Sequence, residues 1–413
     1  MGHPEQPLSL VVDFIDLMID LWQRCLSERY HAPIHYLASL IAYALQLNTI
    51  SLAPHIIASL IPVCTTTCQL VALPRFNSVD GDISQHPDGM VRQLSGDGSV
   101  THCLSLLCQA ALGCLSPSTE DPEMAITLGS SQQIFFWKTV DMEFVIALLS
   151  LKQPESDWFG IISLLWTSVL PDSIGPMPNP ITPTGYGKES LVDSQSRELA
   201  ADAVVERVSI CLAELPRWAA PGSAKELQVR LAVLNTLVLF AASPFGMRHI
   251  ARSNATIQRL VAVLCWAIDR LYDVDPPLPD DDDGDRMEVD VDVVIPNGAG
   301  DDDLDDLVDG GNGECGQDLP TLLCRVISKA VLLLHTLATN SQTSDSVSIL
   351  TQVAASNGGS QRCLLALARL SFAEEDLVLE AGIDIDTVER AHELLELVVT
   401  PDEGEGMSDL FGI

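Results

Sequence analysis

Two pairs of metal-capable side chains stand four residues apart, a spacing that can place both ligands on one helix face. His31 and His35 form the first pair, but Pro33 lies between them and no Glu accompanies them as in metalloproteases. Cys64 and Cys68 form the second pair, and no further pair follows at zinc spacing. Buried thiols are therefore the favoured interpretation of the cysteines, and we expect no metal site.

An Asp-rich run at 280–285 offers carboxylates for calcium, but its spacing does not fit a calcium-binding loop. Such a loop needs oxygen ligands at positions one, three and five before a Gly at position six. With Gly284 at position six, position one is Pro279, and with Gly310 there, position three is Leu307. We predict a solvated, flexible insert, with a phospho-regulated or basic-partner-binding segment as the alternative.

The sequence contains no recognisable motif for phosphate binding or nucleophilic catalysis. The glycine run that begins at Gly310 lies in the acidic segment with no Lys-Ser or Lys-Thr after it, and no Gly-x-Ser-x-Gly elbow occurs. We therefore expect a protein without enzymatic activity or cofactor. An enzyme with an unrecognised helical active site remains as a hypothesis from a different class.

The strongly negative net charge of the chain limits the kinds of molecule that it can bind. The chain has 22 Lys and Arg against 57 Asp and Glu, a net charge of −35. Nucleic acids and anionic membrane surfaces require cationic residues, so we expect no direct binding to either. A basic protein partner is compatible with the charge. We also expect no membrane span, and the odd number of cysteines, eleven, favours a reducing compartment.

The elements that would position any site are helices. Leu8, Val11, Ile15, Ile19 and Trp22 recur at three- and four-residue steps, which indicates an amphipathic helix. The same periodicity predicts further helices at 34–47, 54–61, 100–115, 131–152 (with a break near Asp141), 157–170, 194–215, 224–242, 256–271, 319–339, 346–355, 360–372 and 387–399. We expect loops at 74–98 and 171–188.

Residues 225–271 suggest which helical architecture to expect. An apolar helix, a Ser-Pro-Phe-Gly turn at 243–246, a short helix and a longer apolar helix follow one another, which is the armadillo rhythm. We predict an all-α, HEAT/armadillo-like α-solenoid. Between its helices, residues 273–318 hold 18 acidic residues and one base, Arg286, so they carry 1 − 18 = −17 and are predicted to be a disordered insertion.

The predicted domain organisation follows from these boundaries. Its parts are N-terminal helical repeats at 1–170, a Pro/Gly-rich loop at 171–190, armadillo-like repeats at 191–272, the acidic insertion at 273–318, C-terminal repeats at 319–400 and an acidic tail at 401–413.

Several segments resemble the fungal branch of the ATR-interacting protein family. They are Phe136-Trp137 with Met142-Glu-Phe144, the stretch Leu170-Pro-Asp-Ser-Ile-Gly-Pro, and residues 360–370 and 380–405. The resemblance implies a non-catalytic, nuclear helical-repeat adaptor of the DNA damage response. Its partner would be the N-terminal helical repeats of the ATR-type checkpoint kinase, with an indirect link to single-stranded DNA coated by replication protein A. Residues 1–60 lack the family's acidic recruitment motif and coiled coil, so we expect the chain to correspond to the C-terminal helical portion.

Seven residues of these segments and of the tail are candidate partner contacts: Phe136, Trp137, Phe144, Arg362, Arg369, Leu410 and Phe411. For the aromatic residues near 140, packing in the core is the favoured alternative. The two arginines lie seven apart on one helix face, where they could meet an acidic partner or a neighbouring helix. From helical rhythm and acidity alone, the alternative function is a generic armadillo scaffold, such as a chaperone cofactor or transport adaptor.

Overall fold

The computed structural model describes residues 6–115, 131–177, 189–272, 319–341, 343, 359–372 and 382–398. Among these residues the only β-type pairing is an isolated bridge between Leu170 and Ser173. The helices are α1 (Gln6–Ser27), α2 (Ile34–Leu47), α3 (Thr49–Asn77), α4 (Gly89–Gly96), α5 (Ser99–Gly113), α7 (Ser131–Thr139), α8 (Met142–Leu148), α9 (Glu155–Trp166), α10 (Glu189–Ala213), α11 (Ala224–Ala241), α12 (Pro244–Arg252), α13 (Asn254–Tyr272), α14 (Leu319–Thr339), α16 (Gly359–Ser371) and α18 (Ile385–Val398). The predicted acidic insertion, the predicted helix at 346–355 and the tail lie outside the described residues.

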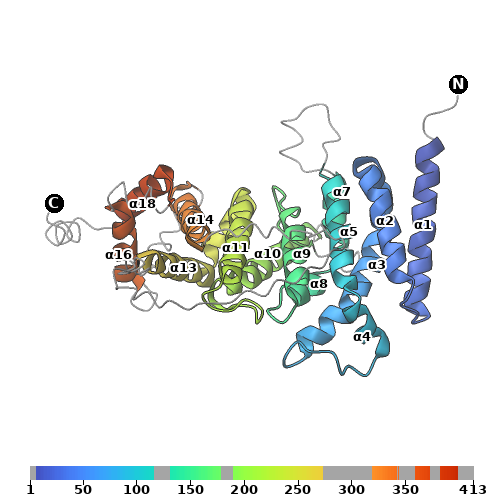
Figure 1. Ribbon diagram of the computed structural model, residues 1–413. Coiled ribbons are helices and arrows are strands. Elements are labelled where there is room, and N and C mark those ends of the chain that lie inside the picture. Colours follow the sequence, from blue (N-terminus) through green and yellow to red (C-terminus); the bar gives the residue numbers. More distant parts are fainter. Residues whose placement is uncertain are drawn as a thin grey trace, which may run out of the picture.

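The helices stack in chain order into an elongated array (Figure 1). At one end α1 packs on α2 and α3, and α5 joins them to α9. At the other end α14 packs on α11, α13 and α18, and α16 packs on α13 and α18. Each helix therefore buries its apolar stripe mainly against neighbours that are near in the array. This arrangement confirms the prediction of an α-solenoid.

The predicted armadillo rhythm is present as α11, α12 and α13. The Ser243 hydroxyl caps α12 by accepting a hydrogen bond from the Gly246 backbone N–H at 3.0 Å, and Pro244 occupies the first turn of the helix. A Cβ at Gly246 would lie 2.3 Å from the Phe240 carbonyl oxygen, so the tight turn after α11 requires glycine. Sequence-local rules thus account for this unit.

The break predicted near Asp141 is also present. Asp141 adopts an extended conformation after α7, and its carboxylate accepts a hydrogen bond from the Glu143 backbone N–H at 3.3 Å, which caps α8. The loop predicted at 74–98 is partly wrong, because α3 continues to Asn77 and α4 occupies Gly89–Gly96.

One long stretch near the start of the chain carries no charged side chain. Residues 30–74 contain no Asp, Glu, Lys or Arg. By length and composition, α3 and α14 are each long and apolar enough to cross a membrane, although two such helices are weak evidence for a span. Within the array, 61% and 56% of their most apolar windows are buried. Packing against neighbouring helices thus accounts for most of this apolar surface.

Candidate interaction surfaces

The aromatic residues proposed from the sequence as partner contacts lie in the core. Phe136, Trp137 and Phe144 are all fully buried. The Trp137 indole N–H donates a hydrogen bond to the Thr167 carbonyl at 3.0 Å, which ties α7 to the end of α9. A side chain with no exposed area cannot contact a partner, so the prediction that these three residues are partner contacts is wrong. The alternative, that they pack in the core, agrees with the structure.

The two arginines on α16 are exposed and contact a neighbouring helix. Arg362 and Arg369 both pair with the Asp269 carboxylate on α13, at 2.7 Å and 3.2 Å. The two arginines, seven residues apart, therefore hold the same carboxylate between them. Of the two alternatives predicted for them, contact with a neighbouring helix is the one that the structure shows. Leu410 and Phe411 lie outside the described residues.

The paired metal-capable residues also have definite places. The Cys64 and Cys68 thiols are fully buried on α3, where burial raises their pKa well above the usual range and each meets the Cys103 thiol. The His35 ring packs edge-on against His102, with ring centroids 4.7 Å apart. Among the described residues, no group of three or more His, Cys, Asp and Glu side chains is placed to hold a metal ion.

Helix α1 has a second apolar face that its neighbours do not cover. Ile15, Ile19 and Trp22 are buried toward the array. The opposite side of the helix carries a stripe at steps of four, three and four residues whose members are between 40% and 69% exposed: Leu10, Phe14, Leu17 and Leu21. A helix that is apolar on two opposite faces is normally buried on both.

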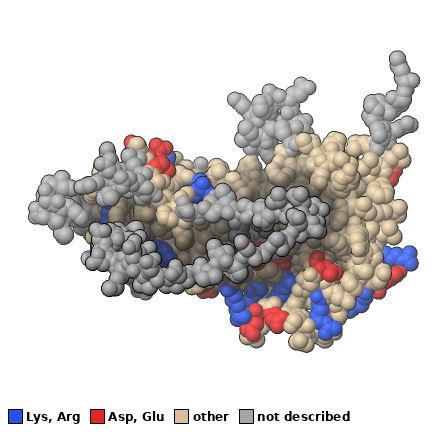
Figure 2. Space-filling view, viewed as in Figure 1, with Lys and Arg blue, Asp and Glu red and all other residues tan. Residues whose placement is uncertain are grey.

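Helix α2 repeats this pattern. Its buried side holds Ile34, Ile41 and Leu45 among others. Its outward stripe has the same spacing and is between 47% and 70% exposed: Tyr36, Leu40, Tyr43 and Leu47. The two stripes together are called the α1–α2 apolar stripes below. In Figure 2 the surface over this end of the array is largely free of charged side chains, which gather lower on the molecule.

These stripes were not predicted, although the sequence holds a signal for them. Leu10, Phe14, Leu17 and Leu21 repeat the three- and four-residue steps of the buried stripe on the opposite face of α1. Uncovered apolar stripes of this kind form a candidate docking surface for another helical surface.

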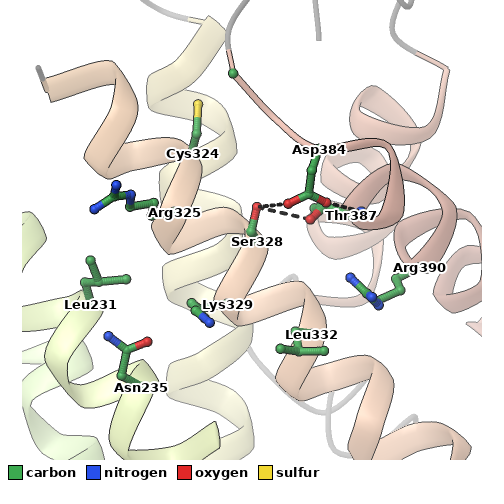
Figure 3. A pocket seen from close by; sticks show the side chains of 11 residues that line it. Leu231, Asn235, Cys324, Arg325, Ser328, Lys329, Leu332, Asp384, Thr387 and Arg390 are labelled. Atoms are coloured by element: carbon green, nitrogen blue, oxygen red, sulfur yellow. Dashed lines mark hydrogen bonds between the residues drawn. The ribbon is translucent and has the colours of Figure 1, made fainter. Parts of the chain in front are cut away.

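A pocket of about 500 Å³ lies at the other end of the array, between α11, α14 and the start of α18 (Figure 3). Four of its lining residues follow one face of α14 at steps of three, one and three: Arg325, Ser328, Lys329 and Leu332. Leu231 and Asn235 line it from α11, and Asp384, Thr387 and Arg390 line it from the α18 side.

Hydrogen bonds join α18 to α14 at the edge of this pocket. The Asp384 carboxylate accepts from the Thr387 backbone N–H at 2.6 Å, which caps α18. The Thr387 hydroxyl donates to the Ser328 oxygen at 3.0 Å, and the Ser328 hydroxyl donates to Asp384 at 3.5 Å. The wall of the pocket is therefore fixed by a cap that also connects two helices.

Comparisons with known proteins agree with this architecture. The family profile described as Rad26-like, helical repeats, matches residues 63–338, and the profile described as Rad26-like, C-terminal domain, matches residues 347–411. The crystal structure of Myceliophthora thermophila Rad26 (residues 373–841) is 48% identical, with a TM-score of 0.78. The match covers 97% of this chain and 90% of that chain. No curated protein matches the sequence.

These matches correct the resemblance drawn from the sequence. The segments that suggested the ATR-interacting protein family include Phe136 and Trp137, which are fully buried core residues. Both family matches and the similar crystal structure carry the Rad26 name instead. The chain belongs to the Rad26-like family and is a checkpoint-related helical-repeat protein.

Proposed function

We propose that this chain is a non-catalytic, nuclear adaptor that binds the N-terminal helical repeats of an ATR-type checkpoint kinase through the α1–α2 apolar stripes. The observation that carries the proposal is the pair of uncovered stripes at one end of the array. Membership in the checkpoint-related Rad26-like family supports a kinase of this class as the partner. Through the kinase complex, the adaptor would be linked indirectly to single-stranded DNA coated by replication protein A.

The stripes fit another helical repeat better than they fit an extended peptide. Apolar side chains at three- and four-residue steps form ridges that interdigitate with the ridges of a facing helix. Burying the exposed part of one Leu or Phe would contribute on the order of 1 kcal/mol. Burying several such side chains on each helix would therefore contribute several kcal/mol, on that order, to the free energy of binding.

Charge at the edge of the α1 stripe argues against a second copy of the chain as the occupant. Asp13 and Asp20 are exposed, seven residues apart, along one edge of the stripe. In a pairing of two identical α1 helices these carboxylates would add to the mutual repulsion of two chains of −35 each. A partner helix with Lys or Arg beside its apolar stripe would instead be attracted.

The test is co-purification of the full chain with the kinase, using a variant that places one charge in each stripe. We expect Leu17→Glu combined with Leu40→Glu to abolish kinase capture, because each carboxylate would have to be buried unpaired at the interface. The circular dichroism spectrum and melting temperature should stay close to those of wild type, since both leucines are about half exposed.

The matched control is Leu365→Glu on α16, a leucine of similar exposure far along the array. It should leave kinase capture unchanged. Equal capture by the double variant and wild type would contradict the proposed surface. A folded wild-type chain that binds a chaperone or a basic cargo, and not the kinase, would support the generic scaffold instead.

A further inference from the structure

Two cysteines on neighbouring helices form a thiol pair. Cys265 lies on α13 and Cys363 lies on α16, and each side chain is 3% exposed. A side-chain hydrogen bond joins the two thiols, and both cysteines are free of any disulfide. The two residues are far apart in the sequence, so the packing of α16 on α13 brings them together.

Further contacts between α13 and α16 hold this pair in place. The Arg362 guanidinium, next to the thiol on α16, donates to the Asp269 carboxylate at 2.7 Å, and Asp269 lies one turn after the thiol on α13. The Tyr272 hydroxyl donates to the Arg369 carbonyl at 3.0 Å. The two helices therefore meet along more than one turn. To form a disulfide, the hydrogen-bonded sulfur atoms have to approach to a bond of about 2 Å.

The surroundings of the pair make its two thiols unequal. The hydrogen bond with Cys363 lowers the pKa of Cys265, and the Arg362 guanidinium acts in the same direction against burial and the Asp269 carboxylate. The same hydrogen bond, together with burial, raises the pKa of Cys363 far above its usual range. Since a thiolate and not a thiol is the nucleophile, Cys265 is the reactive partner and Cys363 holds the proton.

We infer that Cys265 and Cys363 are a modification site at which a hydroperoxide, such as hydrogen peroxide, forms a disulfide between α13 and α16. The Cys265 thiolate attacks one peroxide oxygen, the O–O bond breaks, hydroxide leaves, and Cys265 becomes a sulfenic acid. The Cys363 sulfur then attacks the Cys265 sulfur, and the S–O bond breaks. The hydroxyl group leaves with the Cys363 proton as water, so the two sulfurs have given two electrons to the peroxide.

A second group of thiols is less accessible to a peroxide. Cys64, Cys68 and Cys103 are also in contact, and although burial raises the pKa of Cys103, hydrogen bonds with the other two lower it to about 5. These thiols lie on α3 and α5, which several other helices cover. Helix α16 packs mainly on α13 and α18, near the C-terminal end of the array (Figure 1). A helix with few neighbours opens locally at lower cost, which admits a small oxidant.

The cysteines with more solvent access are held protonated. Cys25 and Cys108 are partly exposed, but burial raises the pKa of Cys25 and raises the pKa of Cys108 to about 12. A protonated thiol reacts slowly with peroxide. The pair on α13 and α16 therefore combines a reactive thiolate, a second thiol in contact with it and a helix that has few neighbours.

The disulfide would join the two matched parts of the chain. Cys265 falls within the helical-repeats match, and Cys363 falls within the C-terminal-domain match. A covalent bond would fasten α16 on α13, where the charged contacts are exposed ion pairs of small individual strength. The site lies at the opposite end of the array from the α1–α2 apolar stripes, so it does not depend on the proposed kinase interaction.

The experiment treats the reduced full chain with hydrogen peroxide, blocks the remaining thiols with iodoacetamide, and maps tryptic peptides without reduction by mass spectrometry. Trypsin places Cys265 in residues 260–270 and Cys363 in residues 363–369, each without another cysteine. We expect these two peptides to appear joined, lighter than their sum by two hydrogen atoms. Dithiothreitol should separate them. Peptides that stay separate after peroxide treatment would overturn the inference.

Variants test the order of the steps. In Cys363→Ser the sulfenic acid on Cys265 has lost the thiol that attacks it, so dimedone should label Cys265 about tenfold or more above Cys108. Cys265→Ser should abolish the joined peptide and leave Cys363 unlabelled. Cys108→Ser is the matched control and should give the joined peptide at the wild-type yield.

Circular dichroism melts identify a variant that fails to fold, and Cys265→Ala then replaces Cys265→Ser. The peptide map of the wild-type chain needs no variant. Equal dimedone labelling of Cys265 and Cys108 in folded Cys363→Ser would contradict the assignment of the reactive thiolate. In the folded wild-type chain, peroxide that joins the thiols of α3 and α5 before those of α13 and α16 would also overturn the inference.

Discussion

At the scale of single residues, one buried ion pair shows how the helices of the N-terminal half are locked together. The Arg75 guanidinium on α3 donates to Asp157 on α9 at 2.7 Å and to Ser95 on α4 at 2.6 Å. The other Asp157 oxygen accepts from the Thr101 hydroxyl on α5 at 2.6 Å. Four helices therefore share one polar network, and its two charged side chains are 9% and 5% exposed.

Asp157→Ala should destabilise the chain strongly, because it leaves the Arg75 charge buried without its partner. Removing one member of a buried pair costs about 3–5 kcal/mol. Urea denaturation followed by circular dichroism measures the change. The control is Asp172→Ala, which removes an exposed partner of Arg197 and should cost less than about 1 kcal/mol. Equal losses in the two variants would mean that burial does not set the strength of these pairs.

At the scale of elements, the periodicity of the sequence predicted most helices because each apolar stripe is a local pattern. The predicted 319–339 is α14 as observed, and the predicted 34–47 is α2. The prediction failed at α3, which was expected at 54–61 and spans Thr49–Asn77. Its three prolines suggest breaks, but each removes only one backbone donor, and burial of the helix among α1, α5, α7 and α8 outweighs that loss.

Candidate sites were harder to predict than helices because they depend on which helices meet. The spacing of Arg325, Ser328 and Lys329 puts them on one helix face, which the sequence does show. That this face meets Asn235 and Arg390 depends on packing between residues roughly 60 to 90 positions apart, and no local rule supplies it. The same limit explains why Arg362 and Arg369 could not be assigned to Asp269 from the sequence.

The contact between α13 and α16 gives a prediction at this scale. Asp269→Ala removes the shared partner of Arg362 and Arg369, whose side chains are 65% and 52% exposed. Screening by solvent makes each exposed pair worth well under 1 kcal/mol, so the free energy of unfolding should fall by less than about 1 kcal/mol. The apolar residues of α16, such as Leu367 and Leu370, should hold the helix in place.

Chemical denaturation of Asp269→Ala beside Leu370→Ala separates these contributions. The buried leucine should cost about 2–5 kcal/mol, several times more than the carboxylate. A loss for Asp269→Ala that equals or exceeds the loss for Leu370→Ala would show that the ion pairs, and not the apolar contacts, dock α16 on α13.

At the scale of the whole molecule, the charge distribution decides which partners the chain attracts. Many of its few cations are already paired within the array, including Arg29, Arg75, Arg197, Arg217 and Arg259. We therefore expect any contact with DNA to be made through another protein, as the proposed adaptor role implies.

Direct binding to bare single-stranded DNA should accordingly be negligible at about physiological salt, because 57 acidic residues repel the phosphates and outnumber the 22 Lys and Arg. Anisotropy with a labelled oligonucleotide measures it. A variant that lacks residues 273–318 tests whether the acidic segment alone causes the exclusion. Its net charge is −35 − (−17) = −18, so it should also fail to bind. Tight, salt-sensitive binding by the full chain would show that a local basic surface outweighs the global charge. Binding that appears only in the shortened variant would instead assign the exclusion to that segment.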